Sequence, residues 1–243
     1  ISKTFNNQYL SNNIFSNKDF YSVLIVSSFF SLWLSTQISA AIESNIAYIM
    51  ILTVGILHGS NDIMLINHSL KSSTNISSFS IFVIYVLMVA SVAVLFYFLP
   101  FIALSLFVIF SSYHFGEEHL SDKVSINHFF DISYFTVYGM LIFSMLFYAA
   151  LPEVNTIMKE LSAVEFSFNQ IMYSLIFSFV FFLGMNLFLL WKKKILLPEF
   201  LKELFFLVLL SLVFNTSSLI LSFVIYFIFC HSIPSIILQI FFF

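Results

Sequence analysis

The chain has 243 residues, of which 60% are hydrophobic and only 9% are charged. This composition excludes an ordinary soluble core and indicates an integral membrane protein. The net charge of −3 is too small to indicate a charged partner, and no basic patch in the sequence favours nucleic-acid binding. The single cysteine, Cys230, cannot form an internal disulfide and is interpreted as a small packing residue.

Apolar runs follow one another along the chain and predict an all-α, polytopic membrane helix bundle of about eight transmembrane helices. No run between them resembles a soluble domain, so residues 1–243 are expected to form a single integral-membrane domain. Because the sequence opens with Ile1 and stops at Phe243, we expect it to be truncated at both ends. The approximate bounds of the predicted spans are 20–38, 44–67, 79–98, 101–116, 130–150, 167–190, 200–214 and 217–240.

The lysines predict the orientation of the bundle, because basic residues are retained on the cytoplasmic side. The chain has no arginine, and with a cytoplasmic N-terminus Lys159 is its single lysine in an outer loop. We therefore expect a multi-pass protein of the cell (inner) membrane with its N-terminus in the cytoplasm. In this arrangement the second, fourth and eighth helices all run from outside to inside.

Three histidines lie at matching depths in these three parallel helices. His58, His114 and His231 each stand about thirteen residues into their predicted span, or roughly 20 Å from the same membrane face at 1.5 Å per residue. Imidazoles that converge at one level can share a metal ion. The sequence therefore predicts a metal site in the cytoplasmic half of the bilayer.

A carboxylate follows the first of these histidines. Asp62 stands four residues after His58, on the same helical face. An ionised aspartate at the centre of a membrane helix costs about 2.5–3.5 kcal/mol, so it requires a partner there. We predict that Asp62 orients the His58 imidazole, as carboxylates do behind metal-bound histidines. The alternative is a hydrated Asp62 at the cytoplasmic interface.

The segment around His114 has more polar residues than the segment around His58. Glu118 stands four residues after His114 and either orients an imidazole or is solvated. Tyr113 either points its hydroxyl into the site or belongs to an interfacial belt. His119 is a tentative fourth ligand, and it reaches the same metal only if the helix breaks or bends at Gly116.

The third motif contains a proline. Pro234 removes a backbone donor and clashes with the carbonyl of Cys230, which predicts a kink beside His231. His68 and His128 are expected in wet positions near the membrane surface, and neither is assigned a role.

These three motifs resemble those of the Brp/Blh family of bacterial and archaeal membrane β-carotene 15,15′-dioxygenases. The sequence HGSND at 58–62 fits the family's His-Gly-x-x-Asp motif, and YHFGE at 113–117 and HS at 231–232 match the other two. YHFG is the most specific of these pieces. Their order, spacing and membrane context agree from about residue 44 to 240.

The resemblance implies a non-haem iron dioxygenase that uses O₂ to cleave the central double bond of β-carotene into two molecules of retinal. His58, His114 and His231 match the family's positions that bind Fe(2+), and no catalytic residue separate from the metal ligands is expected. A retinal-binding rhodopsin is the implied user of the product.

The chain departs from the family at one position. Family members often have a second histidine four residues after the last one, where this chain has Ser235. Either His119 supplies a fourth imidazole, or water or O₂ fills the position, or iron is bound differently. Ser235 is expected beside the metal, together with Asp62, Tyr113 and Glu118.

Two other functions fit three intramembrane histidines. A membrane zinc hydrolase would use them to activate water on a lipid amide. A non-enzymatic haem or transport subunit would use them as axial ligands or as a proton relay. The chain lacks the paired histidines of haem-binding helices and the HxxHH clusters of diiron desaturases.

Overall fold

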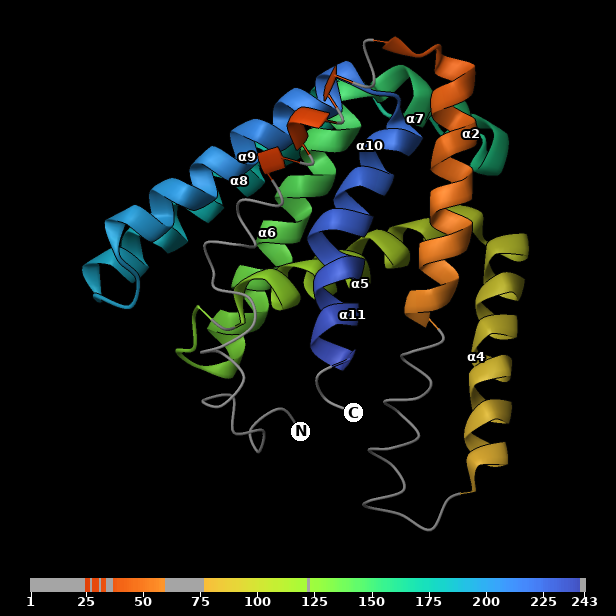
Figure 1. Cartoon of the computed structure of the whole chain (residues 1–243), viewed down its shortest axis with the longest axis horizontal. Helices are drawn as coiled ribbons and strands as arrows, with labels where there is room; N and C mark the ends of the chain where they lie inside the picture. Colours follow the sequence, from red (N-terminus) through yellow and green to blue (C-terminus); the bar gives the residue numbers. More distant parts are fainter. Residues whose placement is uncertain are drawn as a thin grey trace.

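A computed structural model describes residues 25–26, 28–30, 32–33, 37–59, 77–121 and 123–240. Within these ranges the regular structure is entirely helical (Figure 1). Two of the segments, named η, are π-helical, with hydrogen bonds that span five residues instead of four. The elements are α2 (Ala40–Met50), η2 (Ile51–Gly55), α4 (Ser78–Phe98), α5 (Pro100–Leu120), α6 (His128–Ala149), α7 (Leu151–Ser162), α8 (Phe168–Trp191), α9 (Leu197–Thr216), α10 (Leu219–Ile225), η3 (Tyr226–Ser232) and α11 (Ile233–Ile240).

Several of the long helices run in opposite directions, and α5 lies across them (Figure 1). Figure 1 shows α6 and α9 running toward the end of the molecule where α7 lies, while α2, α8 and the α10–η3–α11 run lead away from that end. Five helical runs among the described residues are long and apolar enough to cross a bilayer: Ala41–Gly59, Phe79–Phe98, His128–Ala149, Phe168–Trp191 and Leu219–Ile236. The protein is therefore a helical membrane protein.

The number of about eight spans stays a prediction. The predicted span 20–38 lies largely outside the described residues. Helices α5 and α9, with 21 and 20 residues, have the length of a span but are not among these five candidate spans. Each carries charged side chains near one end, so composition alone does not identify them as spans.

Helices α5 and α6 cross with their backbones in contact. A Cβ atom on Gly116 would lie 1.9 Å from the carbonyl oxygen of Phe135, and one on Gly139 would lie 2.0 Å from that of Ser112. Both positions thus require glycine. Helix α5 is not broken at Gly116, because it is one continuous α-helix from Pro100 to Leu120. The glycine permits close approach of α6 instead.

Two carboxylates fix the N-terminus of α10. The backbone N–H of Ser218 donates to Glu43 Oε2 at 3.0 Å, and that of Leu219 donates to Glu153 Oε2 at 2.9 Å. Negative groups stabilise the first turn of a helix, where backbone donors have no partner within the helix. Since Glu43 belongs to α2, this contact ties the starts of α2 and α10 together.

The last helical run changes its hydrogen-bonding pattern ahead of its proline. Ahead of Pro234 the chain is π-helical from Tyr226 to Ser232, and His231 lies inside this segment. A π-helical segment accommodates backbone groups that a proline removes from the regular pattern. The helical run that contains α2 also has a π-helical segment, η2, and η2 packs against η3.

One helix lies outside the predicted spans. The connection between the predicted spans 130–150 and 167–190 contains the twelve-residue helix α7, which buries Val154 and Met158. Its charged residues, among them Glu153 and Lys159, give it an amphipathic character. Its apolar face covers the ends of α5 and α6.

Candidate metal centre

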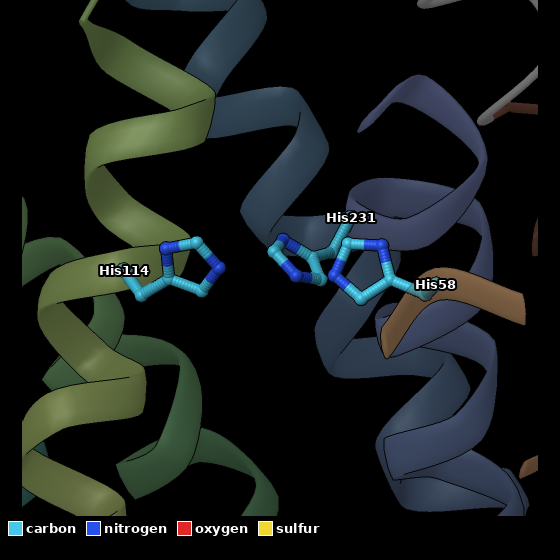
Figure 2. A group of neighbouring side chains, drawn as sticks. All are labelled: His58, His114 and His231. Atoms are coloured by element: carbon cyan, nitrogen blue, oxygen red, sulfur yellow. The ribbon is translucent and has the colours of Figure 1, made fainter. Parts of the chain in front are cut away.

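The three histidines singled out by their depth converge in the structure. One potential ligand atom from each of His58, His114 and His231 lies within 4.8 Å of the others. The imidazole centroid of His231 lies 4.9 Å from that of His58 and 4.8 Å from that of His114. Figure 2 shows the His58 and His114 rings pointing toward His231 from separate helices. A single ion can thus contact all three.

The tie between α2 and α10 explains why two of the rings reach one level. His58 follows Glu43 by fifteen residues, and His231 follows Ser218 by thirteen. Both helices lead away from the same end of the molecule. At 1.5 Å per residue the two imidazoles therefore stand about 20 Å from the common tie.

Aromatic side chains enclose the buried part of the cluster. His58 and His231 are 8% and 2% exposed, whereas His114 is an exposed residue. The Phe115 ring lies 4.7 Å from the His231 ring, and Phe227 lies 5.6 Å from His231 and 6.1 Å from His58. These rings exclude water from two of the three imidazoles and leave the His114 side accessible.

A carboxylate from α5 lies against the third histidine. Glu118 Oε2 lies in close contact with His231 Nδ1, although the geometry is not that of a hydrogen bond. The spacing of His114 and Glu118 did not predict this contact, because the two partners come from distant parts of the chain. The other carboxylate oxygen, Oε1, is buried and has no hydrogen-bond partner among the described residues.

Of the other residues expected around the metal, Tyr113 and Ser235 are among the described residues. Tyr113 donates its hydroxyl hydrogen bond to Glu117 Oε1 at 2.8 Å, one turn along α5. Ser235 is half-buried in α11, a turn past His231. Asp62 lies outside the described residues.

His119 belongs to a second polar cluster. Its Nε2 lies 2.9 Å from Glu203 Oε2, and the Lys123 Nζ donates to Glu203 Oε1 at 2.6 Å. Tyr138 donates to the same carboxylate at 3.3 Å. The His119 ring is stacked between Tyr138 and Phe206, with centroids 5.1 and 5.3 Å away. His119 is not a member of the cluster formed by His58, His114 and His231.

His119 lies beyond the predicted span 101–116, and its surroundings affect its protonation. Burial, reinforced by the positive charge of Lys123, lowers the pKa of His119 below its usual range. A neutral imidazole therefore donates its Nε2–H to the Glu203 carboxylate. This arrangement satisfies Glu203 without a metal ion.

Sequence reasoning missed Glu203. Its signal was a carboxylate in the run 200–214, which apart from Lys202 and Ser211 is apolar and where an unpaired charge would be costly. The same argument that singled out Asp62 applies to Glu203. Its partners on α5 and α6 were not visible in the sequence, because they lie about 65 to 84 positions away.

The donor set suits a divalent transition metal. Three imidazole nitrogens on separate helical segments leave further coordination positions open, which is typical of non-haem Fe(II) and of catalytic Zn(II). The contact from Glu118 to His231 Nδ1 matches the carboxylate that usually supports a metal-bound histidine.

A search of curated proteins and of solved structures finds no match to this chain. A family model described as beta-carotene 15,15′-dioxygenase matches residues 49–242. The matched range covers most of the chain and includes the three convergent histidines. The protein therefore belongs to the β-carotene 15,15′-dioxygenase family.

Proposed function

We propose that this protein is a carotenoid-cleaving dioxygenase that splits the central double bond of β-carotene with O₂ and releases two molecules of retinal. The observation that carries the proposal is the convergence of His58, His114 and His231 within 4.8 Å, in a chain of this family. These residues would hold Fe(2+), which when bound supplies the activation of O₂.

Glu118 orients the His231 imidazole for metal binding. We propose that the Glu118 carboxylate beside His231 Nδ1 favours the tautomer with its proton on Nδ1, which leaves the lone pair on Nε2 for the metal. A neutral imidazole in one fixed tautomer is the form that binds a metal. By the sequence pattern, Asp62 has the corresponding role behind His58.

The remaining coordination positions are left to groups from outside the chain. His119 donates to Glu203 and is stacked between two rings, so we do not assign it as a fourth ligand. Ser235 offers a hydroxyl where the family often has an imidazole. We propose a three-histidine site.

The membrane location suits the substrate. β-Carotene dissolves in the hydrocarbon core and is about as long as that core is thick, roughly 30 Å. Entry from the lipid beside the exposed His114 avoids extraction into water. We place the protein in the cell inner membrane with its N-terminus in the cytoplasm and expect a retinal-binding rhodopsin to use the product.

Expression in a β-carotene-producing host tests the function. The wild-type protein should replace the orange colour with retinal, and purified protein should contain iron. His231→Ala should abolish both retinal and bound iron, while His128→Ala, at an exposed position, should keep both.

The rival zinc hydrolase makes the opposite prediction. Stoichiometric zinc, with turnover that persists without O₂, would refute the dioxygenase. Absence of retinal from a host that accumulates correctly inserted wild-type protein would refute it as well.

A further inference from the structure

An apolar cavity lies away from the histidine cluster. It has a volume of about 360 Å³ and lies between the N-terminal half of α5, helices α6 and α7, and the start of α10. Its volume is within the range of small-molecule sites, about 300–1,000 Å³. The side chains that line it include Leu104, Val108, Met140, Phe147, Met158 and Leu219.

The cavity offers its occupant almost no polar group. Ser105 is the one polar residue among the lining side chains, and its hydroxyl donates to the carbonyl of Phe101 at 2.8 Å. A ligand with polar groups would lose its hydrogen bonds to water on entering the cavity and would gain none there, which would lower its affinity. The lining therefore fits a hydrocarbon.

A row of aromatic rings connects the cavity to the histidines. Phe147 lines the cavity, and its ring lies 5.8 Å from that of Phe143. Phe143 lies 5.8 Å from Phe115, and Phe115 lies 4.7 Å from His231. The side chains between the cavity and the imidazoles are thus aromatic, and Phe115 and Phe143 are buried in the core, so a polyene on this path would contact apolar groups only.

The separation of cavity and histidines matches half of the proposed substrate. Leu104 in the cavity wall and His114 lie on the same continuous helix, ten residues apart, which corresponds to about 15 Å along the axis. A carotenoid of roughly 30 Å has its central bond half that distance, about 15 Å, from either end. An end group in the cavity would thus bring the central bond to the level of His114.

We propose that this cavity binds one cyclic end group of the carotenoid and thereby determines which double bond meets the metal centre. The proposal rests on the proposed function and adds the residues that select the bond. The depth to which the end group enters the cavity determines the position of the polyene. The aromatic row contacts the polyene between the cavity and the histidines.

The test separates binding from cleavage. In a His58→Ala background, which should not cleave, we expect purified protein to retain intact β-carotene, measured by its visible absorption. Adding Val108→Trp fills the cavity and should lower the bound carotene by about tenfold or more, because the indole occupies the space that the end group needs. The matched control is Val180→Trp on the exposed face of α8, which should bind like the parent.

The same substitutions are then made in the otherwise wild-type chain. Val108→Trp should lose most retinal formation, and its residual products should be two aldehydes of unequal length. Met140→Trp, which fills the cavity from α6, should act alike if Val108→Trp fails to fold. Normal carotene binding and normal retinal yield in either folded variant would overturn the cavity assignment. A wild-type protein that makes no retinal would instead refute the proposed function.

Discussion

At the scale of single residues, two neighbouring carboxylates have separate partners. Glu118 contacts His231 Nδ1, whereas Glu117 accepts a hydrogen bond from Tyr113. We expect Glu118→Gln to weaken iron retention by about 10–100-fold, the usual effect of losing a carboxylate behind a metal-bound histidine. Glu117→Gln is the matched control and should keep its iron. Equal iron retention in the two purified variants, measured by metal analysis after dialysis, would contradict the assignment.

His119 supports a second prediction at this scale. Because its imidazole pairs with Glu203 rather than with the histidine cluster, His119→Ala should retain iron at the wild-type level. It should lose about 1–3 kcal/mol of stability, since a buried polar group loses its partner. Thermal unfolding in detergent and metal analysis measure both effects. A variant of normal stability that lacks iron would show that His119 is a ligand.

The sequence predicted part of this site because depth in a membrane helix depends on counting alone. It identified His58, His114 and His231 as neighbours, and the structure brings them together; their role as ligands stays a prediction. Spacing within one helix did not predict the contact of Glu118 with His231 or that of His119 with Glu203. Such contacts depend on helix rotation and crossing, which hydropathy does not specify.

At the scale of elements, the long apolar helices were predicted within a few residues. The predicted span 79–98 corresponds to Ser78–Phe98, and 167–190 corresponds to Phe168–Trp191. These bounds follow from the hydrocarbon thickness, which sets the length of any spanning helix. The π-helical segments were not predicted, because they arise from packing between helices. Helix α7 was not predicted either, because it is too polar to form an apolar run, although its amphipathic pattern is a signal for a surface helix.

From the close crossing of α5 and α6 we predict the effect of replacing Gly116. Gly116→Ala would place a Cβ 1.9 Å from the carbonyl oxygen of Phe135, and backbone atoms cannot move aside as a flexible side chain can. The helices must separate, at a cost of about 1–3 kcal/mol or more, and His114 on the same helix moves with α5. We therefore expect lower thermal stability together with lower iron content.

Gly184 provides the control for this crossing. It lies in α8, and a Cβ atom there would meet nothing within 4 Å. Gly184→Ala should therefore unfold at the wild-type temperature or slightly above it. If Gly116→Ala were as stable and as rich in iron as Gly184→Ala, the close crossing would not position the metal centre.

At the scale of the whole molecule, the lysine distribution and the helix order lead to the same topology. The loop before α6 and the loop after α8 lie at one end of the bundle, and α7 lies at the other (Figure 1). Lys192, Lys193 and Lys194 follow α8 directly, so by the positive-inside rule we expect that end to lie in the cytoplasm. Helices α6 and α8 must then each cross the membrane once.

Single cysteines test this topology in a Cys230→Ala background. Ser125→Cys and Lys194→Cys introduce exposed thiols at the end assigned to the cytoplasm, and Glu160→Cys introduces one on α7. A membrane-impermeant maleimide should label Glu160→Cys in intact spheroplasts and label the other two only in inverted vesicles. The reverse pattern would overturn the orientation while keeping the crossings. Labelling of Ser125→Cys and Glu160→Cys from the same side would mean that α6 does not span the bilayer, and the bundle that brings the three histidines to one depth would have to be abandoned.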